Sequence, residues 1–139
     1  MENKHLLLDI LNKSLRLEYS LIIHYPLINK AIHDPDIKNM VNILGVVSIK
    51  HADTVADAIT ALGGTPQWDF ESAPDEIDLK KIFRVQLEKE KLALKLHSET
   101  TDMINDKVLK AKFEAIAGQE VGHIKLVENI LHLIDQGKR

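Results

Sequence analysis

The chain contains no cysteine, and this absence excludes several classes of site at once. Disulfides, thiolate nucleophiles, cysteine-based zinc sites and iron–sulfur clusters all need that residue. The chain also has no surplus of basic residues: its formal net charge is −3, so its composition favours neither nucleic acid nor an anionic membrane as a partner. No apolar run approaches the roughly 20 residues of a membrane span. Charged residues interrupt the segment 1–20, so we expect no signal peptide and a cytoplasmic location.

Strand signals are missing as well, whereas helical periodicity runs through most of the chain. Apolar residues recur at spacings of three, four and seven, which predicts helices over residues 4–33, 35–62, 78–104 and 107–135. Asp34 followed by Pro35 is typical of a helix start, and Gly63 and Gly137 are typical of helix ends. With 139 residues, 45% of them hydrophobic, we expect one all-α domain over residues 1–139, folded as an antiparallel four-helix bundle.

The segment 63–77 is the one long stretch without a helical period. It holds two of the four prolines and the only tryptophan. A connection of this length can return the chain along the bundle, so we expect the second and third helices to run parallel. Trp68 and Phe70 are expected to hold this crossover connection against the side of the bundle.

Each predicted helix carries polar residues near the middle of its apolar stripe. A charged carboxylate buried without a partner is very costly, and a metal ion is one partner that satisfies carboxylates and imidazoles together. Four helices of similar length would bring their middles into one layer of the bundle. Three carboxylates and two imidazoles form the ligand mixture of a carboxylate-bridged pair of iron or manganese ions. The five candidate metal ligands are Glu18, His51, Glu90, Glu120 and His123.

Three further residues on the stripes are candidates for a part in the same site. Ser48 lies one turn before His51 and interrupts the same stripe. His97 lies two turns after Glu90 on the same face, where it is either an additional ligand or a residue that orients one. Tyr25 is either a packed aromatic residue or a redox relay. Four histidines fall off the stripes and are expected in solvent or at an interface: His5, His24, His33 and His132.

Three motifs carry a resemblance to a known family: IKHAD at 49–53, LGGTP at 62–66 and QEVGHI at 119–124. They resemble the second helix, its exit and the fourth helix of bacterioferritin, a member of the ferritin-like superfamily. Glu18 and Tyr25, seven residues apart, resemble that family's ligand on the first helix and the tyrosine near its metal site. The resemblance covers nearly the whole chain and implies a ferritin-like bundle with a non-haem di-iron site.

The resemblance also implies how the ligands divide between two ions. Glu18 and His51 are expected to hold one ion, Glu90 and His123 the other, and Glu120 to bridge them. Three glutamates supply three negative charges against the four positive charges of two divalent cations. The remaining charge needs an exogenous anion, or the site holds a single ion.

The sequence departs from the bacterioferritin pattern at three places. Ser48 stands where that family has the second bridging glutamate, and a neutral serine hydroxyl is a poor ligand for iron. Ile49 stands where that family has a haem-binding methionine, so we expect no haem. The chain ends at Arg139, without the family's short fifth helix.

These observations leave three functions open. The first is binding of non-haem iron, with ferrous oxidation or peroxide reduction as a possible oxidoreductase activity and an unknown redox partner. The second is a site with one zinc or manganese ion and no redox turnover. The third is a metal-free helical bundle that binds other proteins.

The oligomeric state follows from the apolar residues outside the core stripes. Leu21, Ile28 and Val47 are expected to be such residues on the first two helices. A two-fold pair along those helices is the simplest way to cover them. We therefore expect a small homo-oligomer, most simply a homodimer, without a mineral core.

Overall fold

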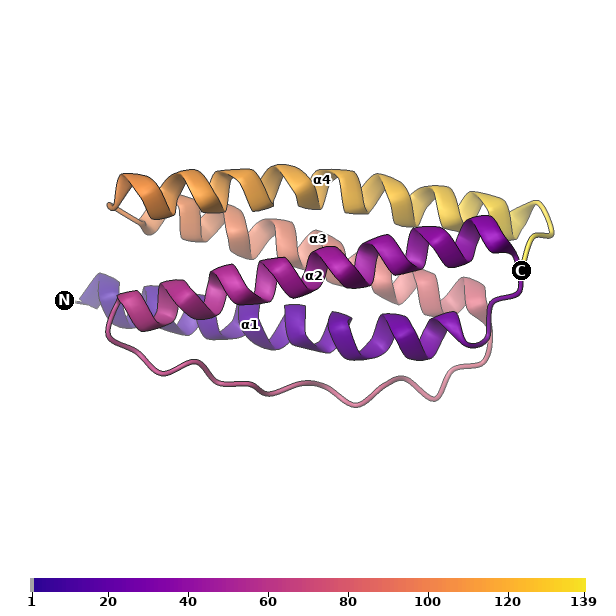
Figure 1. The fold of residues 1–139 in the computed structure, drawn as a ribbon, viewed down its shortest axis with the longest axis horizontal. Coiled ribbons are helices and arrows are strands. Elements are labelled where there is room, and N and C mark those ends of the chain that lie inside the picture. The colour runs from indigo at the N-terminus through magenta and orange to yellow at the C-terminus, as the bar shows by residue number, and fades with distance from the viewer. Residues whose placement is uncertain (1) are drawn as a thin grey trace.

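The computed structural model describes residues 2–139, and it confirms the predicted all-α four-helix bundle (Figure 1). Within those residues there is no strand, and no helix is both long and apolar enough to cross a membrane. The four helices follow one another along the chain as α1 Glu2–Asn29, α2 Pro35–Ala61, α3 Leu79–Met103 and α4 Lys107–Asp135.

The bundle consists of two antiparallel helix pairs joined by one long crossover. A short turn joins α1 to α2 and another joins α3 to α4, whereas the crossover connection runs along the outside of the bundle from one end to the other (Figure 1). Because the crossover returns the chain to the end at which α2 begins, α2 and α3 run parallel, as the sequence predicts. The middles of all four helices consequently lie at the same level.

The helix ends follow the capping residues of the sequence. Asp34 begins α2 by accepting a hydrogen bond from the Ile37 N–H at 3.0 Å, with Pro35 in the first position of the helix. Gly63 and Gly137 end α2 and α4 with φ angles of +86° and +89°, in the left-handed region that glycine adopts without strain.

The first helix ends earlier than predicted, at Asn29 instead of residue 33. Two groups from outside the helix satisfy its last turn. The Lys38 ammonium donates to the Asn29 carbonyl at 2.8 Å, and the Ile32 N–H donates to the same carbonyl at 3.2 Å. With its terminal carbonyl capped in this way, the chain turns before it enters α2.

A polar layer separates the two larger clusters of the hydrophobic core, and a third, smaller cluster lies between α1 and α3. The two larger clusters form the apolar halves of the core: one packs around Tyr25 and Phe83, and the other around Leu11 and Phe113. Between the halves, at mid-length of every helix, lie fully buried carboxylates, imidazoles and a serine. The apolar halves therefore hold the four helices in register on either side of that layer.

The crossover connection is fixed to α1 by hydrogen bonds and aromatic contacts. The Ser20 hydroxyl accepts from the Glu71 N–H at 2.9 Å, and the His24 Nε2–H donates to the Glu71 carbonyl at 2.8 Å. Tyr19 packs edge-on against Trp68 and Phe70, with ring centroids 5.4 and 5.5 Å away. The predicted packing role of those two aromatic residues is confirmed.

Three expectations about the surface of α1 were wrong. Leu21 and Ile28 are buried in the core of this chain and leave no apolar surface to cover, since the face that α1 buries is wider than a single stripe. His24 was expected in solvent or at an interface, but it is buried within this chain, where it contacts Glu71 of the crossover connection. The large apolar side chains that α1 and α2 do expose are instead Leu6, Leu27, Ile43, Val46 and Ile49.

Candidate metal centre

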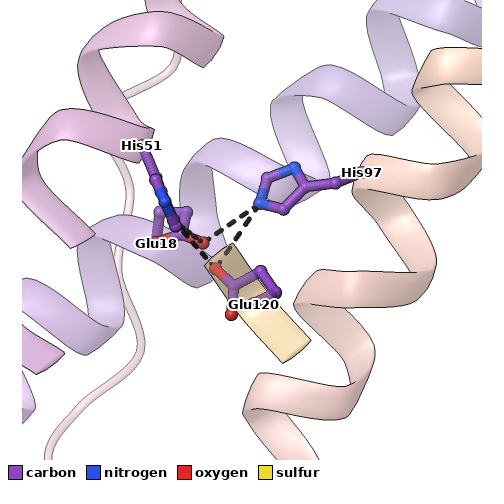
Figure 2. A group of neighbouring side chains, drawn as sticks. All are labelled: Glu18, His51, His97 and Glu120. Atoms are coloured by element: carbon purple, nitrogen blue, oxygen red, sulfur yellow. Dashed lines mark hydrogen bonds and ion pairs between the residues drawn. The ribbon is translucent and has the colours of Figure 1, made fainter. Parts of the chain in front are cut away.

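All five predicted ligands meet in the polar layer, and His97 joins them. Each helix turns its buried face toward the bundle axis, so residues three or seven apart on one helix point the same way. Figure 2 shows one side chain from each helix converging on a common point. The six residues are all buried within the chain, and only His123 retains a trace of exposure, at 5%. The set consists of Glu18 on α1, His51 on α2, Glu90 and His97 on α3, and Glu120 and His123 on α4.

The first ligand group combines two carboxylates with two imidazoles: Glu18, His51, His97 and Glu120 (Figure 2). His51 Nδ1 lies 2.8 Å from Glu120 Oε1 and 3.5 Å from Glu18 Oε1. His97 Nε2 lies 3.2 Å from Glu18 Oε1 and 3.8 Å from Glu120 Oε1. One potential metal-ligand atom from each residue therefore faces a shared centre.

The second ligand group consists of Glu90, Glu120 and His123. His123 Nδ1 lies 3.3 Å from Glu90 Oε2 and 3.5 Å from Glu120 Oε2. Glu120 thus turns Oε1 toward the first group and Oε2 toward the second. A carboxylate in that position is able to bridge two ions.

The carboxylates of the layer need a cation that the protein does not supply from lysine or arginine. Among residues 2–139, Lys80 and Lys91 form the only lysine ion pairs, and both lie at the surface. Several atoms that could ligate a metal are buried with no hydrogen-bond partner: Glu18 Oε2, both Glu90 oxygens, Glu120 Oε2 and His123 Nδ1. Orphaned buried groups of this kind call for an explanation, and metal coordination satisfies all of them. The residues present therefore fit a metal.

Without metal, protons carry the positive charge of the layer. Burial lowers the pKa of His51, but hydrogen bonds to Glu120 and Glu18 outweigh burial and raise that pKa to about 10. Burial also lowers the pKa of His123, and contacts with Glu120 and Glu90 raise it to about 9. Burial raises the pKa of the Glu90 carboxyl to about 8, although His123 opposes this. Burial likewise favours protonated Glu120, but His123 and His51 hold the pKa of its carboxyl well below its usual range.

One supporting residue was missed by the sequence reasoning. Gln119 Oε1 accepts a hydrogen bond from His51 Nε2 at 2.7 Å, so it fixes the ring with Nδ1 toward the carboxylates. Histidine ligands commonly donate their second N–H to such a partner. Its position directly before Glu120 was the only sequence signal for Gln119. That signal is weak, because neighbouring residues do not share a helix face, and the contact of Gln119 is with His51 on α2.

Ser48 and Tyr25 both lie in the buried interior, as predicted. The Ser48 hydroxyl donates to the Leu44 carbonyl of its own helix at 2.9 Å. The Tyr25 hydroxyl is fully buried without a hydrogen-bond partner. Burial and the nearby Glu90 carboxylate raise the Tyr25 pKa well above its ordinary value.

Comparison with known proteins identifies the family of this chain. The profile of the ferritin-like domain family matches residues 8–137. The chain belongs to the ferritin-like domain family. No curated protein matches this ferritin-like chain.

Solved structures with the same fold cover nearly the whole ferritin-like chain. A ferritin-like, diiron-carboxylate protein from Bacillus anthracis is 22% identical, covers 94% of this chain and 99% of its own, and superposes with a TM-score of 0.86. The bacterioferritin of Rhodobacter capsulatus is 26% identical, with 94% and 86% covered and a TM-score of 0.76. The dodecameric thioferritin of Bacteroides fragilis is 20% identical, with 96% and 88% covered and a TM-score of 0.82.

The pKa values predict that the metal-free protein loses stability as pH rises. Glu90 holds its proton up to about pH 8 when folded, and His51 and His123 up to about pH 10 and 9, whereas the unfolded groups release theirs earlier. The folded state therefore binds more protons between about pH 5 and pH 9, and each excess proton lowers the free energy of unfolding by about 1.4 kcal/mol per pH unit. Thermal melts in chelator should show the melting temperature falling by roughly 20 °C between pH 6 and pH 8.

A Glu90→Gln variant provides the matched control for this prediction. It keeps the shape of the side chain but cannot ionise, so its melting temperature should fall less steeply over the same range. A metal-free melting temperature that rises from pH 6 to pH 8, or an unchanged slope in the variant, would contradict the assignment of these shifts to the layer.

Proposed function

We propose that this ferritin-like chain binds two iron ions in the polar layer and oxidises them from ferrous to ferric. The position of Glu120 supports this proposal most directly, because it turns one oxygen toward each ligand group. Its Oε1 lies 2.8 Å from His51 Nδ1, and its Oε2 lies 3.5 Å from His123 Nδ1. The Bacillus anthracis neighbour is a diiron-carboxylate protein, and the Desulfovibrio desulfuricans bacterioferritin, 22% identical, has a diiron site. Both share the fold of this chain.

The residues divide between the ions as the ligand groups do. Glu18 and His51 would hold one ion, Glu90 and His123 would hold the other, and Glu120 would bridge them. Bound ferrous iron would supply the two electrons that, with two protons, reduce one molecule of peroxide to two molecules of water. Gln119 orients His51, and the apolar halves of the core keep bulk water from the layer.

Tyr25 is proposed as a redox relay beside this site, carrying an electron to or from the iron ions without a net change in its own oxidation state. It is fully buried on α1, seven residues from Glu18, and the Glu90 carboxylate contributes to its raised pKa. Its hydroxyl has no hydrogen-bond partner in the described structure, so packing alone holds it in place.

Metal analysis after purification without chelator tests the proposal. The protein should carry or take up two iron ions per chain under anaerobic conditions, and Glu120→Ala with His123→Ala should reduce uptake to one ion or none because the bridge is lost. The matched control is Glu128→Ala with His132→Ala, which removes the same residue types from exposed positions of α4.

The outcomes of this experiment separate the proposal from its alternatives. Unchanged uptake and affinity in the Glu120, His123 double variant would place the metal elsewhere. One ion of zinc or manganese per chain with no iron oxidation in air or peroxide would support the non-redox site. No bound metal, and no metal-dependent rise in melting temperature, would support an interaction module. A metal at about 100 times its dissociation constant should stabilise the folded chain by roughly 2.7 kcal/mol.

We also propose that the chain forms a homodimer through α1 and α2. Leu27, Ile43, Val46 and Ile49 are about half exposed. Val46 and Ile49 also line a hollow of about 170 Å³ between the two helices. An apolar face that is the same on both copies suits a two-fold interface. Ile49 offers no thioether at this face, so we expect no haem there.

Light scattering after size-exclusion chromatography checks the dimer. The wild-type protein should have the mass of two 15.7 kDa chains, and Ile43→Lys with Val46→Lys should yield monomers because charge would be buried in the interface. Val108→Lys, at an exposed apolar position of α4, is the control and should leave the dimer intact. A monomeric wild type would contradict the proposal, as would a hollow particle of many subunits that keeps more than two iron ions per chain.

A further inference from the structure

His97 occupies a place that the division of ligands between two ions does not use. It lies on α3, seven residues after Glu90, and is fully buried. Its Nε2 faces the first ligand group, 3.2 Å from Glu18 Oε1, whereas its Nδ1 has no hydrogen-bond partner. The ring packs against Phe113, with centroids 6.2 Å apart. The polar contacts of His97 are therefore all directed toward the ligand group (Figure 2).

With His97 included, the first group has the dimensions of a tetrahedral site. Metal-to-nitrogen and metal-to-oxygen bonds of about 2.1 Å place neighbouring ligand atoms of a tetrahedron about 3.4 Å apart. The four nitrogen-to-oxygen distances in the group are 2.8, 3.2, 3.5 and 3.8 Å, which fall on both sides of that value. Small side-chain movements would thus close two carboxylates and two imidazoles around one ion.

The second group has only three ligands. Glu90, Glu120 and His123 each turn one atom toward it, and within the described residues no fourth carboxylate or imidazole reaches it. Ser48 lies in the same layer on α2, but its hydroxyl is bonded to the Leu44 carbonyl. The side chain of His123 is 7% exposed, whereas those of the other five ligands are completely buried. The second group is therefore both incomplete and nearest to solvent.

We propose that the two metal positions of this chain are unequal, and that His97 makes them so. His97 is a ligand that closes the first position with two nitrogens and two oxygens. The second position keeps an exchangeable site, where an exogenous molecule such as peroxide or water binds. This inference rests on the proposed di-metal function. The nitrogen-rich first position should fill first and should favour zinc or ferrous iron over manganese, which binds more weakly to such ligands.

Anaerobic titration with cobalt(II) tests the inequality on the full-length protein. Tetrahedral cobalt(II) absorbs visible light far more strongly than five- or six-coordinate cobalt(II). The first equivalent should therefore produce an intense absorption band, and the second should bind more weakly and add little intensity.

Two variants distinguish the positions. His97→Ala should abolish the intense band and weaken binding of the first equivalent at least about 10-fold. Replacing a residue that only hydrogen-bonds to a metal ligand already lowers metal affinity by about that factor. His123→Ala removes the same residue type from the other position, so it should abolish the second step and leave the first step and its band unchanged. Far-UV circular dichroism establishes that both variants are folded.

A measurement on the wild type alone keeps the inference testable if a variant does not fold. X-ray absorption of protein loaded with one equivalent of zinc should show four ligands at about 2.0–2.1 Å, two of them imidazoles. A single imidazole, or two cobalt equivalents of equal affinity and spectrum, would overturn the role of His97 and leave the di-metal proposal standing. A chain that binds no metal would overturn both.

Discussion

Three carboxylates and three imidazoles lie buried between two apolar halves of the core, and that layer must hold positive charge. Buried anions without a compensating charge are too costly to persist, and neither lysine nor arginine pairs with these carboxylates in the described residues. Protons fill the need in the metal-free chain, as the raised pKa values of His51, His123 and Glu90 indicate. Protons and metal ions therefore compete for the same place, and metal binding releases protons.

The rest of the fold keeps this layer in one plane and away from water. Each helix contributes at mid-length, so the two hydrophobic clusters on either side hold the ligands in register. The crossover connection makes the arrangement of parallel α2 and α3 possible, and its bonds from Glu71 to Ser20 and His24 fix it along α1 (Figure 1). Stability and the ligand layer are thus coupled: the same packing that stabilises the bundle forces the polar side chains to face one another.

Much of the site could be predicted because helical periodicity fixes which residues share a face. Glu18, Glu90, Glu120 and His123 each interrupt an otherwise apolar stripe, and the four predicted helices place them at one level. The width of a buried face cannot be predicted in this way, so Leu21 was wrongly expected outside the core. Contacts made by irregular segments are also invisible to periodicity.

His24 illustrates the second limit, since it is buried against Glu71 of the crossover connection and Lys89 of α3. His97 illustrates a third limit. Its helix face was evident from the sequence, but its distance to Glu18 depends on how α3 packs against α1. Gln119 depends in the same way on the packing of α4 against α2.

The central claim is that Glu120 lies between two metal positions, and anomalous diffraction from crystals soaked anaerobically with ferrous iron tests it most directly. The account predicts two anomalous peaks about 3.5–4 Å apart, one on each side of the Glu120 carboxylate, one beside His51 and the other beside His123. Peaks confined to the protein surface, or no peak in the polar layer at all, would contradict it.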